Sequence, residues 1–163
     1  MRFTQIDKIT EIEPWVRISA VKGLSLGEEY LRDHFPRFPV MPGVMMLEAM
    51  YQASAWLVRY SEDFTHAGVL LKEARNVRYG DFVAPGQILT ITCEVLKQDE
   101  QTTTLKTQGA LGENVAVSAR LVLERFHLAD RYPGREPTDA YARRRFREIF
   151  ALLYTPAAKA PSA

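Results

Sequence analysis

The chain has one cysteine, Cys93, and almost no net charge. A single cysteine excludes an internal disulfide bond and any metal site built from several thiolates. Twenty-one basic residues against twenty acidic ones give a formal charge of +1, so no overall field favours nucleic acid as a partner. The sequence has no apolar run of about eighteen residues that would span a membrane, and its start, MRFTQIDKIT, lacks the apolar core of a signal peptide. We therefore expect a reducing, cytoplasmic location.

The sequence also lacks a glycine-rich phosphate loop and internal repeats. What it does have is an ordinary globular composition of 163 residues, 47% hydrophobic and 25% charged, enough for one domain with a sizeable core. We expect this domain to span residues 1–130. The polar stretch RYPGREPTD then predicts a linker, with a helix from Asp139 to Leu153, in residues 131–155. Residues 156–163 are expected to form a disordered tail.

Alternation of apolar and polar residues predicts strands on both sides of one apolar segment. We predict strands at about residues 12–22, 67–79, 87–97, 101–111 and 115–126, with a short helix or turn ending near Arg32. One face of the strand at about residues 87–97, QILTITCEVLK, is expected to carry Leu89, Ile91, Cys93 and Val95. One face of the last strand is expected to carry Val115, Val117, Ala119, Leu121 and Leu123. The letters GEN between the last two strands predict a hairpin turn.

The segment from Gly43 to Tyr60 is apolar or small on nearly every side, which is typical of a buried helix. Pro42 suits the first position of such a helix. Antiparallel strands around one buried helix predict an α+β fold, a sheet of five or six strands packed on a central helix, with a C-terminal helical extension.

Glu48 is the only carboxylate in this apolar helix. Burying an ionised carboxylate without a partner is costly, so such groups are paired, hydrogen-bonded or kept protonated. Two interpretations stay open: Glu48 faces solvent or binds a nearby amide, or it is a functional group in an apolar pocket.

The stretch HFPRFPVMPG precedes the helix and has a proline at every third position. Each proline pushes the residue before it toward extended angles, which predicts a stiff, polyproline-like arm. A stiff arm could hold His34 in one place for proton transfer. The alternative is that His34 is a packed, hydrogen-bonded core residue.

Gly43 and Val44 lie where the predicted helix begins. The first amides of a helix have no intrahelical partner, and the helix dipole favours negative charge there. These amides could therefore hold a carbonyl oxygen on which charge develops. The alternative is that Gly43 only relieves crowding after Pro42.

These residues form a pattern that closely resembles the β-hydroxyacyl-acyl-carrier-protein dehydratases of type II fatty acid synthesis, whose signature is similar to HFPxxPxxPGVxxxEAxAQ. The resemblance covers roughly residues 5–127. The matching positions are His34, Phe35, Pro36, Pro39, Pro42, Gly43, Val44, Glu48, Ala49 and Gln52.

The resemblance implies a hot-dog fold and a homodimer, possibly a trimer of dimers, in which His34 of one protomer and Glu48 of the other share each site. It implies reversible dehydration of a (3R)-hydroxyacyl thioester, carried by the phosphopantetheine arm of acyl carrier protein, to a trans-2-enoyl thioester. His34 would take the proton next to the carbonyl, the Gly43 amide would stabilise the thioester oxygen, and Glu48 would help the hydroxyl leave. No metal or organic cofactor is implied. Structural support near the site is expected from Pro36, Pro42 and Gln52.

Departures from the family pattern are Asp33, Arg37 and Tyr51, where the family usually has small residues. They put the substrate in doubt more than the reaction. Two rival functions stay open: a hot-dog thioesterase or coenzyme A ester hydratase, and a non-catalytic module that binds acyl thioesters.

The remaining charged residues carry weaker signals. His66 and His127 lack the spacing of metal ligands. The run of arginines at 143–145 is expected to be a solvated helix face or a docking site for the acidic carrier protein. The same docking role is open for Arg37, Lys72 and Arg78. The C-terminal helix is expected either to cover an apolar patch or to mediate assembly.

Overall fold

An antiparallel sheet curves over one long helix in the computed structural model, which describes residues 3–156. The expected tail, apart from Pro156, lies outside the described residues. In chain order the strands are β1 (Lys8–Glu13), β2 (Arg17–Gly23), β3 (Gly68–Tyr79), β4 (Ile88–Gln98), β5 (Thr102–Leu111) and β6 (Asn114–Phe126). The helices are η1 (Glu29–Arg32), α1 (Gly43–Ser61), α2 (Leu128–Arg131) and α3 (Glu136–Leu153). The sheet has six strands in the order β1-β2-β4-β5-β6-β3, and all neighbours are antiparallel.

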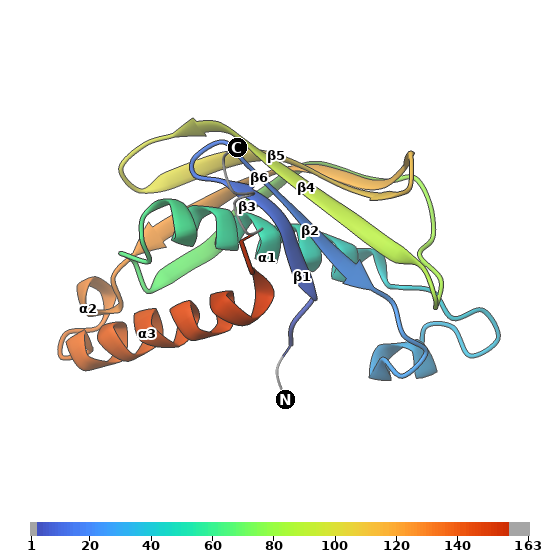
Figure 1. Ribbon diagram of the computed structural model, residues 1–163, viewed down its shortest axis with the longest axis horizontal. Coiled ribbons are helices and arrows are strands. Elements are labelled where there is room, and N and C mark those ends of the chain that lie inside the picture. Colours follow the sequence, from blue (N-terminus) through green and yellow to red (C-terminus); the bar gives the residue numbers. More distant parts are fainter. Residues whose placement is uncertain (1–2, 157–163) are drawn as a thin grey trace, which may run out of the picture.

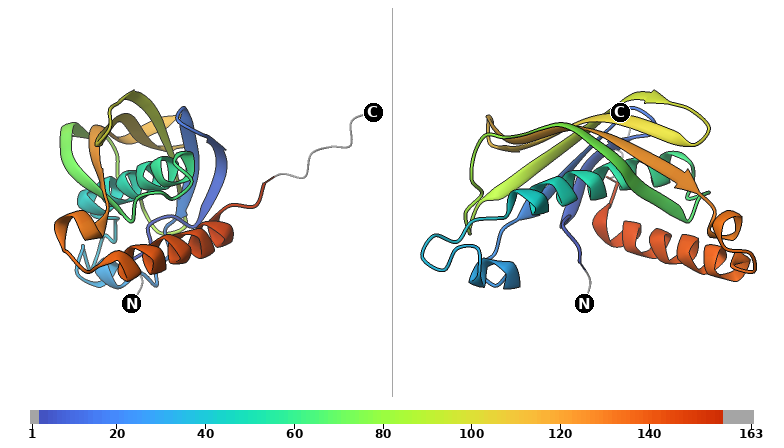
Figure 2. Two further views of the ribbon diagram at one scale, coloured as in Figure 1. Left: turned by 90° about the vertical axis from the view of Figure 1, so that its left-hand side faces the viewer. Right: turned by 180° about the vertical axis from the view of Figure 1, so that it is seen from behind.

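Helix α1 lies in the hollow of the sheet, and α3 lies against the side of α1 that faces away from the sheet (Figure 1). The end-on view in Figure 2 shows the strands arching around α1. All six strands contact α1, since the sheet buries the helix along its length. This arrangement confirms the predicted α+β hot-dog fold with a C-terminal helix.

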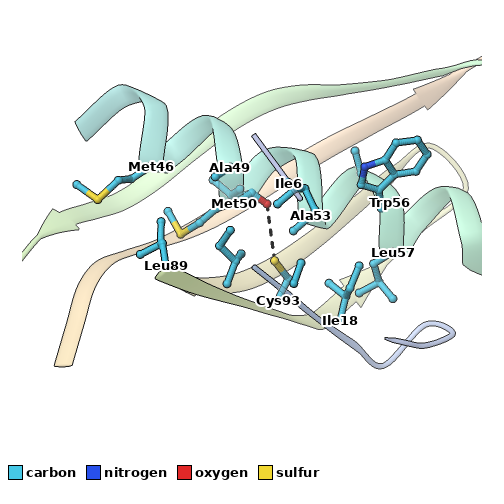
Figure 3. Packing of buried hydrophobic residues seen from close by; sticks show 14 of the residues in the cluster. Ile6, Ile18, Met46, Ala49, Met50, Ala53, Trp56, Leu57, Leu89 and Cys93 are labelled. Atoms are coloured by element: carbon cyan, nitrogen blue, oxygen red, sulfur yellow. Dashed lines mark hydrogen bonds between the residues drawn. The ribbon is translucent and has the colours of Figure 1, made fainter. Parts of the chain in front are cut away.

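The inner face of β4 supplies much of the core beneath α1 (Figure 3). Leu89, Ile91 and Cys93 are fully buried there, as the alternation predicted. The Cys93 thiol donates a hydrogen bond to the Met50 carbonyl across a 3.7 Å gap. Burial raises the pKa of the Cys93 thiol to about 12, so this cysteine stays a thiol and acts as a small apolar core residue.

The expected strand over 12–22 was wrong, because two strands and a tight turn occupy this region. β1 ends at Glu13 and β2 begins at Arg17, and the Val16 amide bonds back to the Glu13 carbonyl. Trp15 lies in the turn with φ 59°, the left-handed residue typical of a three-residue hairpin loop. The apolar alternation continued through Trp15, so periodicity alone hid the turn.

The expected inner face of β6 was wrong at one position, Val115, whose side chain is 46% exposed. The pairing of β5 with β6 shifts by one residue between Gly109 and Ala110. At this bulge two successive residues of β6, Ala116 and Val117, are both fully buried. Beyond the bulge the inner face follows the predicted alternation. Because a bulge also bends a strand, it helps the sheet curve around α1.

Helix α3 begins three residues before the predicted Asp139, and residues 128–131 form the short helix α2 where the end of the domain and a linker were expected. Asp139 joins the two helices: its carboxylate accepts hydrogen bonds from the amides of Leu128 (2.8 Å) and Ala129 (2.9 Å). Burial alone would raise the pKa of Asp139, but these two amide bonds, with His127 and Arg143 nearby, hold the pKa below the usual range.

Aromatic side chains pack α3 against the C-terminal half of α1. Phe150 stacks on Tyr60 with ring centroids 4.9 Å apart and meets Phe64 edge-on at 5.6 Å. Phe146 meets Trp56 edge-on at 6.0 Å. The C-terminal helix therefore covers an apolar side of α1, one of the two roles expected for it. Among residues 3–156, no helix combines the length and the apolar character needed to cross a membrane.

Replacing Asp139 is expected to loosen the α2–α3 corner. Asp139→Ala should lower the free energy of unfolding by about 1 kcal/mol, the usual cost of a lost helix cap. Because the folded pKa of Asp139 is lowered, its contribution is complete above the ordinary aspartate pKa of about 4 and is lost as the pH falls through the lowered value. Urea unfolding followed by tryptophan fluorescence measures both effects. Glu136→Gln, an exposed change on the same helix, is the control, and an equal loss in both variants would contradict the capping role.

Candidate active site

His34 is fixed by hydrogen bonds on both its ring and its backbone. Its Nδ1 lies 3.0 Å from the carbonyl oxygen of Val40. A carbonyl can only accept, so Nδ1 carries a proton, and the neutral ring then has its lone pair on Nε2. The His34 amide donates to Tyr30, and the His34 carbonyl accepts from the Val40 amide. The ring, which also stacks on Phe35 at 4.3 Å, is therefore held as a base with a defined free nitrogen.

The predicted polyproline-like arm was wrong, because the loop turns back on itself. The Phe38 amide donates to the Phe35 carbonyl at 3.0 Å, with Pro36 at the second position of the turn, which proline favours. The Phe35 amide donates in return to Phe38. Bonds across the loop, rather than an extended chain of prolines, hold His34 in place.

The N-terminus of α1 offers free backbone amides beside this loop. Pro42 is the N-cap, not the first helical residue as predicted, and Gly43 begins the helix. The Pro42 carbonyl accepts hydrogen bonds from the amides of Met45 and Met46. The amides of Gly43 and Val44 lie before these residues and have no carbonyl to bond within the helix. Among the described residues these two amides have no hydrogen-bond partner.

Gly43 has a packing role as well as a position at the helix tip. A Cβ added at Gly43 would lie 2.8 Å from Cε1 of Tyr79, at the end of β3. The glycine therefore lets the Tyr79 ring cross the first turn of α1. The crowding that Gly43 relieves comes from this ring, a contact between distant segments that the sequence did not reveal.

Helix α1 is less buried around Glu48 than its apolar pattern predicted. Residues 53–59 are buried throughout, but Val44 is 68% exposed and Glu48 is half-buried. The reason is that α3 covers only the second half of α1 (Figures 1 and 2). The first half keeps an open side within one chain.

Gln52 holds Glu48 and the start of the chain together. Its Nε2 donates to Glu48 Oε1 (2.8 Å) and to the Phe3 carbonyl (2.9 Å), and its Oε1 accepts from the Gln5 amide (2.8 Å). Both ends of the side-chain amide are thus used. This geometry gives Gln52 the supporting position that was expected, one helical turn from Glu48.

A pocket of about 240 Å³ opens beside Glu48. Side chains of α1, of α3 and of the first described residues surround it. Its lining consists of Phe3, Thr4, Glu48, Tyr51, Gln52, Ala55, Trp56, Arg59, Phe146 and Ile149. Glu48 is thus half-buried, as the first interpretation expected, and it also lines a pocket with apolar walls, as the second one requires.

His34 and Glu48 have different hydrogen-bond partners within one chain. The His34 ring bonds Val40, Glu48 bonds Gln52, and in the described part of the chain no hydrogen bond or ion pair joins the two side chains. His34 is not among the residues around the Glu48 pocket.

A second polar cluster, away from this pocket, was missed in the sequence. The rings of His66 and His127 stack with centroids 4.5 Å apart. Glu62 bonds the His66 Nδ1 at 2.9 Å and lies 3.8 Å from Arg125. Only the pairing of β3 with β6 brings these histidines together, so their spacing in the chain gave no signal. Among residues 3–156, no three His, Cys, Asp or Glu side chains are placed to hold a metal ion.

Comparison with known proteins identifies the family. Residues 1–120 match the family model described as a FabA-like domain. The protein named 3-hydroxyacyl-[acyl-carrier-protein] dehydratase FabZ from Levilactobacillus brevis is 34% identical over 116 residues, which cover 71% of this chain and 78% of that protein. The protein of the same name from Magnetococcus marinus is 35% identical over 122 residues, covering 74% and 80%.

Solved structures show the same fold at lower identity. The dehydratase heterocomplex ApeI:P from Xenorhabdus doucetiae has a chain with a TM-score of 0.63 and 20% identity, over 77% of this chain and 85% of that one. A Streptococcus mutans protein bound to acetyl CoA has a TM-score of 0.59 and 13% identity, over 78% and 93%. On the family model and the sequence relatives together, the chain belongs to the FabA-like family of 3-hydroxyacyl-[acyl-carrier-protein] dehydratases.

Proposed function

We propose that the protein catalyses the reversible dehydration of (3R)-hydroxyacyl thioesters on acyl carrier protein to trans-2-enoyl thioesters, in the synthesis of fatty acids or related lipids. The observation that carries this proposal is the orientation of His34, whose Nδ1 bonds Val40 and whose Nε2 is left as a base. The names of the relatives, all dehydratases of this class, support it.

The proposed reaction uses three groups. His34 Nε2 takes the proton from the carbon next to the thioester carbonyl, and the electron pair moves toward the carbonyl oxygen. The amide of Gly43, together with that of Val44, stabilises the charge on that oxygen. Glu48, in its protonated form, gives a proton to the hydroxyl group, so that the carbon–oxygen bond breaks and water leaves. No step calls for a metal or an organic cofactor.

We propose that a second copy of the chain completes each site. Within one chain the His34 ring bonds Val40 and Glu48 bonds Gln52, and the family resemblance implies that His34 of one copy meets Glu48 of the other. Exposed apolar side chains cluster around His34 and the tip of α1, and such patches mark interfaces. They are Phe35, Phe38, Val44, Tyr79 and Phe82. Strand β3, at the edge of the sheet, also offers free backbone groups to a partner strand.

The wider setting of the proposal follows the family resemblance. The homodimer would be the active unit and a trimer of dimers the full assembly. The phosphopantetheine arm of acyl carrier protein would deliver the substrate. We propose a cytoplasmic location, and the buried, unpaired thiol of Cys93 suits a reducing compartment.

Mixed dimers test the reaction and the shared site together. His34→Ala and Glu48→Ala should each lower the dehydration of a 3-hydroxyacyl thioester by about 10²–10⁴-fold, the usual contribution of a general acid or base. A dimer made from one copy of each variant has one intact site, so part of the activity should return. The absorbance of the enoyl thioester is the measurement.

The same assay separates the rival functions. Release of free thiol without an enoyl product would mean a thioesterase, and a fully active pair of single variants would remove the proposed roles. Mixed dimers that form but stay inactive would contradict a site divided between two chains.

Gln52→Ala is expected to lower the rate of dehydration by up to about 100-fold, the cost of misplacing a reacting group by about 1 Å. The physical reason is that Glu48 loses its 2.8 Å bond and the segment at Phe3 loses its anchor. Gln98→Ala, an exposed change at the end of β4, should leave the rate unchanged. If steady-state rates of the two variants agree, Gln52 does not position Glu48.

A further inference from the structure

The Glu48 pocket continues along one face of α1 as far as Arg59. Glu48, Gln52, Ala55 and Arg59 are spaced by four, three and four residues, so they lie on one side of the helix. Arg59 follows Glu48 by eleven positions, which corresponds to about 16 Å of helix. The pocket therefore has a carboxylate near one end of α1 and a guanidinium nearer the other.

Apolar and aromatic side chains form the wall between these two charges. Helix α1 contributes Ala55 and Trp56, and α3 contributes Phe146 and Ile149. Such a wall suits the methylene groups of an acyl chain. Because α3 lies beyond the part of the chain that matches the family model, the side of the wall that α3 forms is not part of the matched domain.

Arg59 is a buried cation whose hydrogen-bonding capacity is largely unused. The residue is only 9% exposed. Its NH2 reaches the Val69 carbonyl at a long 3.4 Å, its guanidinium lies 4.1 Å from the centre of the Phe146 ring, and its Nε has no hydrogen-bond partner. A guanidinium has five donors, and a buried charge without a counter-ion is costly.

The side chain of Arg125 is also buried near this helix and its Nε also has no hydrogen-bond partner, but it has a carboxylate beside it. Arg125 lies 3.8 Å from Glu62, and its NH2 also donates to the Asp99 carbonyl. Glu62 is in turn bonded to His66 at 2.9 Å. Within residues 3–156, Arg59 forms no ion pair of this kind.

The surroundings of Arg59 leave it charged. Burial lowers the pKa of its guanidinium, while the Tyr51 hydroxyl and Glu62 oppose this shift. Arginine nevertheless remains a cation in proteins, because its ordinary pKa is far above neutral. The pocket thus offers a permanent positive charge in an apolar enclosure, where an anion would be held strongly.

We propose that Arg59 forms the far end of the acyl pocket and binds a carboxylate at the distal end of the acyl chain. The preferred substrates would be 3-hydroxyacyl thioesters that end in a carboxylate rather than a methyl group. This inference rests on the proposed function, which places the reacting carbons at Glu48. It gives Arg59 a carboxylate partner in the pocket, since Arg59 forms no ion pair within residues 3–156 and Glu62 acts on it only as a nearby charge.

Two saturated acyl-pantetheine analogues of equal length, one ending in methyl and one in carboxylate, test the proposal by calorimetry without any turnover. The wild-type protein should bind the carboxylate analogue about tenfold or more tightly, the effect of one charge-assisted hydrogen bond. Arg59→Met should remove this preference and Arg59→Lys should keep part of it. Arg144→Met, an exposed arginine on α3, should leave the preference unchanged.

The ratio of the two affinities on the wild-type protein decides the matter even if Arg59→Met fails to fold. Equal affinities, or tighter binding of the methyl analogue, would overturn the role of Arg59. Turnover of the matching 3-hydroxyacyl thioesters is measured separately. Dehydration of the methyl-ended substrate with no preference for carboxylate would overturn this inference and leave the proposed reaction standing. Selective carboxylate binding without dehydration would support the role of Arg59 and overturn the proposed reaction.

Discussion

Unequal burial of α1 is the constraint on which the candidate site depends. The sheet covers this helix along its length, whereas α3 covers only the second half (Figures 1 and 2). The covered half can be apolar throughout, but the open half can carry a carboxylate without stranding it in the core. Glu48 lies in that open half, bonded to Gln52 and beside a pocket. Helix α1 thus provides a rigid support for a charged group that the hydrophobic core could not hold.

Rigidity on the other side of the site comes from backbone hydrogen bonds. His34 bonds Val40 through both its ring and its carbonyl, and Val40 is fully buried. The next residue, Met41, donates to the Val83 carbonyl at 2.8 Å. The loop is therefore tied to the turn between β3 and β4 as well as to α1. A base anchored in this way keeps one tautomer, which is what repeated proton transfer requires.

The sequence predicted the central helix, the C-terminal helix and four of the six strands to within a few residues, because periodicity over long segments is a strong signal. It misplaced features set by single backbone conformations, such as the left-handed Trp15 and the bulge near Val115. The motif pointed to the loop that holds His34 and to the first turn of α1. It could not show that Tyr79 crosses Gly43, because that contact joins segments thirty-six residues apart and depends on how β3 is paired.

Arg59 escaped notice in the sequence because an arginine near the end of an apolar helix is commonly a solvated cation at the favourable pole of the helix dipole. Only the packing of α3 turns it into a buried group facing a pocket. The residues that would carry the chemistry lie in the matched domain, whereas Phe146 and Ile149 lie beyond it. A pocket built this way separates two requirements: the groups that act on the thioester end stay fixed, while the wall at the distal end can change shape or polarity without moving them.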